Sequence, residues 1–101
     1  MPHTKARLTH VFKLNDEVKG RVERKVWEVP RDEKNPDGIR YRLVFIPAGR
    51  KSPAVLYDNH HPKGHHKHID GQEVPYEYHS FEDLLKDFRR DIEAFNENTR
   101  D

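Results

Sequence analysis

The sequence predicts an α+β fold, in which an antiparallel, meander-like sheet of four or five strands packs against one long C-terminal amphipathic helix. Short runs that alternate apolar and polar residues occupy the chain before Ser80, and turn signals rich in Gly, Pro, Asn and Asp separate them. This pattern is typical of strands. The last segment instead repeats its apolar residues with the spacing of one helical face. Because a sheet with one apolar face needs a cover, we expect the helix to supply the second layer.

The strand predictions rest on this alternation. The clearest strand is 39–46, where every second residue is apolar. Further strands are predicted at 22–29, 54–57 and 74–78. The run 8–14 fits either a strand or one helical turn, so the predicted count is four or five.

The C-terminal helix is predicted from its apolar spacing and its start signal. Ser80 precedes the helix and Asp83 follows three residues later, which is a capping-box arrangement. Asp87 and Asp91 lie beside the apolar stripe, and we expect no function for them. Segment 96–101 is expected to form a frayed end. The residues of the stripe are Phe81, Leu84, Leu85, Phe88, Ile92 and Phe95.

Length, charge and cysteine usage limit the class of protein. The 101 residues are sufficient for one domain, 1–101, in which 1–19 is an N-terminal segment of uncertain structure. The 19 basic and 18 acidic residues give a net charge of +1, so any anion-binding surface must be local. The absence of cysteine excludes disulfides, thiolate metal sites and a cysteine nucleophile.

The apolar runs of the chain are short. None approaches the ~20 residues of a membrane-spanning helix, and no signal peptide is visible. We therefore expect a cytoplasmic protein that makes no membrane contact. A chain of this size buries only about 60–70% of its unfolded surface, and so thin a core is compatible with a homodimer.

Histidine is the one residue type present in unusual number: the chain has eight, and five of them lie between His60 and His68. A chain reversal at 62–64, where the sequence is Pro-Lys-Gly, would fold this segment into a hairpin. If His60 pairs with His66, alternation brings four polar residues to one face: Asp58, His60, His66 and His68. A slip of one residue presents another set: Asn59, His61, His65 and Lys67. The sequence does not fix the register.

Three interpretations of this segment fit the residues alone. Two imidazoles, whose ordinary pKa is ~6.5, could serve as general base and general acid in metal-free RNA cleavage, in which a 2′-hydroxyl attacks the adjacent phosphorus. A metal site for zinc or another divalent ion is the second interpretation. The third is a solvated surface loop. The candidate metal ligands are Asp58, His60, His66 and His68.

Motifs on both sides of the histidines resemble one known family. The strand segment Tyr41-Arg42-Leu43 is followed by Tyr57-Asp58-Asn59-His60, then by Gly64-His65-His66-Lys67-His68 and a helix rich in Phe and Asp. In these features, over about residues 22–95, the chain resembles the TumE-type toxins of prokaryotic toxin–antitoxin systems. The resemblance implies a toxin encoded beside a DNA-binding antitoxin that neutralises it.

With this resemblance, we predict a toxin that is a histidine-dependent endoribonuclease and needs no cofactor. Its partners would be an RNA substrate and the cognate DNA-binding antitoxin. A histidine pair, an aspartate that orients one ring and a lysine that stabilises phosphate charge form the predicted catalytic set: His60 with His66 or His68, Asp58 and Lys67. The predicted substrate-binding residues are Arg40, Arg42, Lys63, Asn59 and His65. The alternative is an interaction protein, not a nuclease, whose His/Asp cluster binds a divalent metal such as zinc.

Overall fold

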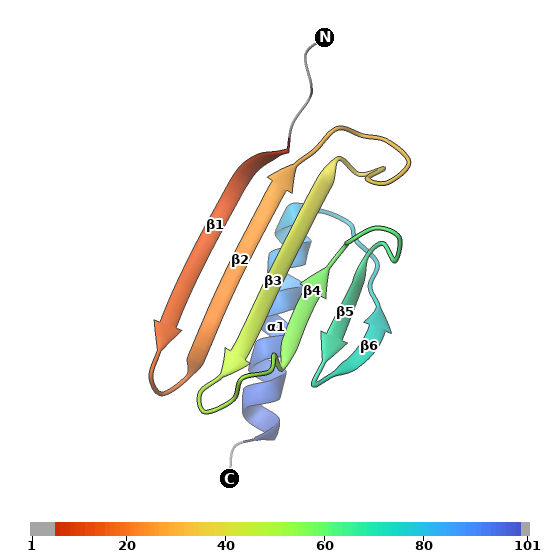
Figure 1. Cartoon of the computed structure of the whole chain (residues 1–101). Helices are drawn as coiled ribbons and strands as arrows, with labels where there is room; N and C mark the ends of the chain where they lie inside the picture. The colour runs from red at the N-terminus through yellow and green to blue at the C-terminus, as the bar shows by residue number, and fades with distance from the viewer. Residues whose placement is uncertain (1–5, 100–101) are drawn as a thin grey trace.

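Six antiparallel strands and one helix make up the computed structural model, which describes residues 6–99 (Figure 1). The strands follow one another across a single sheet in chain order, so the topology is a meander. The helix lies behind the middle of the sheet in the view of Figure 1. The α+β prediction is confirmed, with six strands instead of four or five. The elements are β1 (Arg7–Asp16), β2 (Gly20–Glu28), β3 (Ile39–Pro47), β4 (Val55–Asp58), β5 (His66–Ile69), β6 (Gln72–Pro75) and α1 (Phe81–Asn98).

The core lies between α1 and the central strands. Alternate residues of β3 face the helix, and Tyr41, Leu43 and Phe45 are buried there. Tyr57 of β4 packs edge-on against Phe88 of α1, with ring centroids 5.7 Å apart. Burial of one such side chain contributes about 1.5–3 kcal/mol, so this layer holds the helix on the sheet. Within residues 6–99 the other face of the sheet carries no helix, and it is here called the open face.

α1 begins where the capping signal predicts. The Ser80 hydroxyl oxygen accepts the backbone N–H of Asp83 at 3.0 Å, and Glu82 adds negative charge to the first turn. The helix continues to Asn98, into the segment 96–101 that we expected to fray. Residues 100 and 101 of that segment lie outside the described part. Among the described residues no helix is both long enough and apolar enough to cross a membrane.

β1 shows that the run 8–14 is a strand. It pairs with β2 along its whole length, with one irregularity between Leu8 and His10. Most of segment 1–19 is therefore part of the sheet, while residues 1–5 lie outside the described part.

The histidine segment contributes a strand of its own, β5. A two-residue turn at Asp70 and Gly71 joins it to β6, and both turn residues have positive φ, 49° and 88°. This is the hairpin geometry that Asp-Gly favours. β6 ends at Pro75, which has no N–H to donate. The strand predicted at 74–78 is therefore displaced toward the turn and begins at Gln72.

β4 is much shorter than β3. β3 has nine residues and β4 has four, and β4 pairs only with the part of β3 from Arg42 to Phe45. The first residues of β3 therefore project past the end of β4. The connection from β4 to β5, which contains three of the eight histidines, begins beside this uncovered part of β3.

Candidate functional site

The pairing of β4 with β5 brings three predicted site residues to the open face. Asp58 lies opposite His66, and Leu56 lies opposite His68. Because opposed residues of antiparallel strands share a face, Asp58, His66 and His68 project from the side away from α1. The next strand adds Arg42, which pairs with Asp58.

This register differs from both alternatives in the sequence prediction. The pairing of His60 with His66 is wrong, because Asp58, two residues earlier, takes that position. A shift of two residues keeps each side chain on its predicted face, but it leaves His60 beyond the end of β4. There the Asp58 carboxylate accepts the backbone N–H of His60 at 2.6 Å, which turns the chain out of the strand.

His66 and His68 lie ring against ring on the open face. Their ring centroids are 5.3 Å apart and the rings are inclined by 75°. His66 Nδ1 lies 2.8 Å from the carbonyl oxygen of Gly64. Since a carbonyl oxygen can only accept, Nδ1 carries the hydrogen, and the neutral ring keeps its lone pair on Nε2. His66 as a whole is only 7% exposed.

His68 faces an acid from β6. Its Nε2 lies 3.9 Å from Glu73 Oε1, and Lys63 Nζ donates to the same oxygen at 2.8 Å. The hydrogen bond from Lys63 is the main reason that the pKa of Glu73 lies below its ordinary value. The charges of Lys63, His66 and His68 act in the same direction, against the effect of desolvation. Glu73 is therefore a carboxylate at neutral pH and can pair with a protonated His68.

Basic side chains continue the open face across β3 and β2. Within residues 6–99, neither Lys25 nor Arg42 has an acidic group within ion-pair distance. At the end of β3, Arg40 Nη2 lies 3.4 Å from His60 Nδ1. Such unpaired cations suit a bound phosphate. One row across four strands consists of Lys25, Arg42, Asp58 and His66.

A cavity of about 200 Å³ opens beside His68. Leu56 and the ion pair between Arg50 and Asp70, 2.8 Å long, form part of its wall. Pockets for whole small molecules usually measure ~300–1,000 Å³. This cavity is therefore smaller than a typical site for a whole small molecule.

Lys67 lies on the opposite face of β5 from its two histidine neighbours. Its Nζ donates to Asp91 Oδ2 of α1 at 2.9 Å, and the Tyr57 hydroxyl donates to the same oxygen. Tyr76 donates to Asp87, one turn earlier on α1, at 2.6 Å. These two aspartates, for which the sequence predicted no role, fix α1 to the sheet. Lys67 belongs to that contact and is not brought together with the open-face histidines.

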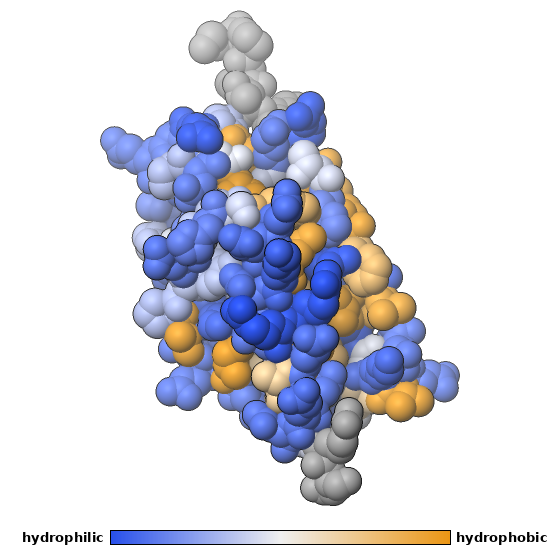
Figure 2. Space-filling model, turned by 180° about the vertical axis from the view of Figure 1, so that it is seen from behind, coloured by the Kyte–Doolittle hydropathy of each residue, from blue (hydrophilic) through white to orange (hydrophobic). Residues whose placement is uncertain are grey.

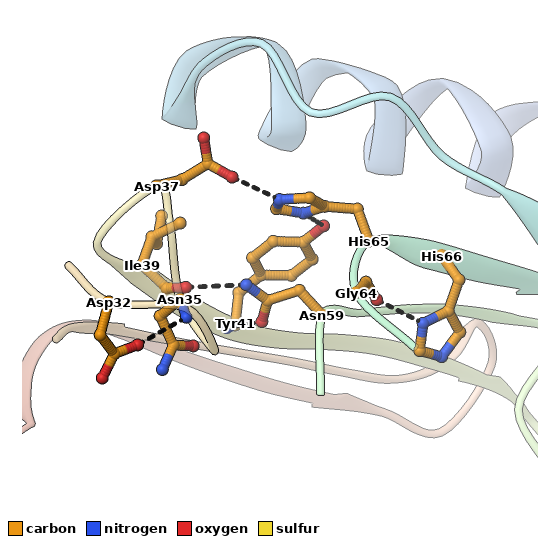
Figure 3. A network of polar contacts seen from close by, with 9 residues as sticks. All are labelled: Asp32, Asn35, Asp37, Ile39, Tyr41, Asn59, Gly64, His65 and His66. Atoms are coloured by element: carbon orange, nitrogen blue, oxygen red, sulfur yellow. Dashed lines mark hydrogen bonds and ion pairs between the residues drawn. The ribbon is translucent and has the colours of Figure 1, made fainter. Parts of the chain in front are cut away.

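His65 is held in a network at the end of the sheet (Figure 3). Its Nε2 lies 2.7 Å from Asp37 Oδ2, and its Nδ1 lies 2.8 Å from the Tyr41 hydroxyl. The ring also stacks on Tyr78, with centroids 4.9 Å apart and planes within 5° of parallel. Both ring nitrogens are occupied, so His65 anchors the loop and has no free nitrogen for a substrate.

Asn59 fills the place beside β3 where β4 has ended (Figure 3). Its Oδ1 accepts the backbone N–H of Tyr41 at 2.9 Å, and its Nδ2 donates to the carbonyl oxygen of Ile39 at 2.7 Å. The side chain thus satisfies two backbone groups of the strand. Asn59 is only 6% exposed, so its amide supports the loop from inside.

The alternative metal site is not assembled. Within residues 6–99, no three His, Asp or Glu side chains are grouped so that they could hold an ion. The Asp58 carboxylate already accepts the His60 N–H, and His66 Nδ1 already donates to Gly64. In this arrangement the predicted ligands Asp58, His60, His66 and His68 do not come together as one site among the described residues.

Two open-face residues, Lys25 and Glu73, were missing from the sequence prediction. Glu73 could have been found, since the two-residue Asp-Gly turn places it opposite His68. The position of Lys25 depends on how β2 pairs with β3 across the connection 29–38, and no local pattern fixes that pairing.

Comparison with family models gives a match over nearly the whole chain. A family described as "Toxin TumE" matches residues 3–96, a span that contains all six strands and most of α1. No curated protein and no solved structure matches the chain.

Proposed function

The chain belongs to the TumE toxin family, and we propose that it acts as a histidine-dependent endoribonuclease at the open face of its sheet. The observation that carries the proposal is the pair His66 and His68, whose ring centroids lie 5.3 Å apart on the face that also carries Arg42, a cation with no acidic partner among the described residues. Two imidazoles and a phosphate-binding cation are the groups that metal-free RNA cleavage requires.

In the proposed reaction, His66 Nε2 removes the proton from a ribose 2′-hydroxyl. The 2′-oxygen then bonds to the adjacent phosphorus, and the bond from phosphorus to the 5′-oxygen of the next nucleotide breaks. Protonated His68 gives its proton to that leaving oxygen, so the products are a 2′,3′-cyclic phosphate and a 5′-hydroxyl. One proton is accepted and one is donated, and no co-reactant is needed.

The neighbours of the two histidines support this division of roles. The hydrogen bond from Nδ1 to Gly64 leaves His66 with an accepting Nε2. The carboxylate of Glu73, 3.9 Å away, pairs with His68 when that ring is protonated. Arg42 would stabilise the charge that develops on the phosphoryl oxygens, and the cavity beside His68 would receive one base.

The other predicted residues take supporting positions in this proposal. His60, next to Arg40 at the rim, would contribute to RNA binding. Asp58 faces His66 across the strands and also fixes the turn that follows β4. Lys67 stabilises the fold through α1. The partners would be an RNA substrate and a DNA-binding antitoxin that neutralises the toxin.

Cleavage of single-stranded RNA by the purified chain tests the proposal. His66→Asn keeps a donor toward Gly64 but removes the proton acceptor, and we expect it to lower the cleavage rate by about 100-fold or more. The matched control is His79→Gln, since His79 is exposed and lies outside the open face. We expect the control to cleave RNA like the unmodified chain.

Growth arrest in cells gives a second readout. His66→Ala and His68→Ala should each relieve the arrest, while circular dichroism shows that both variants remain folded. Full toxicity of both variants would contradict the nuclease proposal.

A further inference from the structure

The edge strand β1 forms a second surface feature, separate from the histidine site. β1 pairs with β2 on one side, and no other strand within residues 6–99 pairs with the outer edge of its ten residues. An unpaired edge accepts a further strand readily, because its backbone N–H and C=O groups are free to form a ladder. Beyond the irregularity between Leu8 and His10, the rest of β1 has regular register.

Exposed apolar side chains concentrate on this strand. Among the described residues, six large apolar side chains are exposed, and four of them lie on β1: Leu8, Val11, Phe12 and Leu14. In Figure 2, which views the molecule from the helix side, hydrophobic surface runs along the side of the molecule where β1 lies. α1 therefore leaves this part of the sheet uncovered.

Two arginines next to this apolar surface, Arg24 and Arg89, have no acidic partner in the described part of the chain. Arg24 pairs with Phe12 in the sheet, and its guanidinium lies 4.2 Å above the Phe12 ring. Burial, followed by the positive charge of Arg89 on α1, lowers the pKa of Arg24. Arg24 Nε and His10 Nε2 are both buried without a hydrogen-bond partner among the residues that the structure describes. Within residues 6–99, neither arginine forms an ion pair, so an added carboxylate would find both charge and donors here.

We propose that β1 binds an extended segment of a partner protein in which apolar and acidic residues alternate. The segment would add a strand to the free edge, cover Phe12 and Leu14 with its apolar residues, and place a carboxylate near Arg24 and Arg89. The partner is the cognate antitoxin, and in this respect the inference rests on the proposed toxin function.

A second copy of this chain is a less suitable occupant. Antiparallel pairing of β1 with its own copy would bring both pairs of arginines, Arg24 and Arg89, to the same face of one continuous sheet. It would supply no acid to either pair, and like charges on one face disfavour association.

Binding of the purified antitoxin to two matched variants tests the surface. Leu14→Asp places a negative charge on the apolar strand, and Val18→Asp places the same charge in the exposed turn beside it. We expect Leu14→Asp to raise the Kd by about tenfold or more and Val18→Asp to leave it unchanged. Arg24→Gln should also weaken binding and reduce its dependence on salt.

Hydrogen exchange and toxicity complete the experiment. Backbone amides of β1 should become protected in the complex, and Leu14→Asp should still cleave RNA while resisting neutralisation by the antitoxin. Equal binding of the antitoxin by all three variants would overturn the inference. It would also be overturned if the chain alone forms a dimer that Leu14→Asp dissociates, because β1 would then bind a second copy of the chain. The two proposals can also fail separately. If the unmodified chain does not cleave RNA, while Leu14→Asp loses antitoxin binding and Val18→Asp keeps it, the nuclease proposal is wrong and the proposed binding surface is supported.

Discussion

The two faces of β4 and β5 hold their polar side chains in different ways. On the helix side, Lys67 and Tyr57 both donate to Asp91. On the open side, His66 and His68 contact each other, and His66 Nδ1 donates to the backbone carbonyl oxygen of Gly64. Lys67 lies between the two histidines in the sequence and yet has another environment. Alternation along a strand, more than closeness in sequence, decides which residues can act together.

The largest expected effect comes from changing the two faces of β5 one at a time. His68→Gln should lower the rate of RNA cleavage by about 100-fold or more, because glutamine cannot give a proton to the leaving oxygen. Lys67→Gln should lower stability and leave the cleavage rate of the folded fraction nearly unchanged. A fluorescent single-stranded RNA measures both rates, and urea unfolding measures stability.

The role first predicted for Lys67, stabilisation of phosphate charge, requires the opposite result. In that case Lys67→Gln would slow cleavage about as much as His68→Gln, at unchanged stability. Such a result would show that Lys67 reaches the substrate and would remove the distinction between the two faces.

The next largest effect is expected on the helix side. Asp91→Ala leaves the Lys67 ammonium and the Tyr57 hydroxyl without their shared acceptor in a partly buried place. We expect the free energy of unfolding to fall by about 1–3 kcal/mol. Glu93→Ala is the control, since Glu93 is an exposed acid on the same helix, and it should change stability by less than about 0.5 kcal/mol. Equal losses in both variants would mean that Asp91 does not fix α1 to the sheet.

Alkaline pH should also weaken the helix side. Burial is the main cause that raises the pKa of all four tyrosines above the ordinary value of 10.0, and hydrogen bonds to Asp91 and Asp87 add to it at Tyr57 and Tyr76. Because the folded state holds these phenol protons more tightly than the unfolded state does, the stabilisation is complete below about pH 10. It is lost as the pH rises above that value. We therefore expect unfolding and phenolate absorbance to appear together above pH 10. A tyrosine that ionises near pH 10 while the protein stays folded would contradict this.

The sequence predicted those parts of the fold that local patterns determine. β3 and α1 follow from alternating apolar residues and from the Ser80 capping signal, both of which act over a few residues. β5 could not be recognised in this way, because its residues are mostly polar and it depends on pairing with β4. That pairing sets Asp58 opposite His66 and Val55 opposite Ile69, and no alternation of apolar residues in β5 indicates this register.

The candidate site was predictable to the same extent. Asp58, His66 and His68 share a face in the structure as in the prediction, because an error of two residues in register preserves the face. His65 and Lys67 could not be placed, since their positions depend on Asp37 in a distant connection and on Asp91 of α1. Tertiary contacts of this kind leave no local pattern in the sequence.

The smallest expected effect is that of metal on the open face. If zinc bound with a Kd one hundredth of the free zinc concentration, it would raise the free energy of unfolding by about 2.7 kcal/mol. For a domain of this size, that corresponds to a rise of about 10–20 °C in Tm. Among residues 6–99 the predicted ligands do not come together as a group of three, so binding would first require the strands and the connection after β4 to rearrange. We therefore expect zinc or EDTA to leave both Tm and the cleavage rate unchanged. A zinc-dependent rise in Tm that His68→Gln abolishes would show that the open face rearranges into a metal site, and the acid and base roles of its histidines would then have to be abandoned.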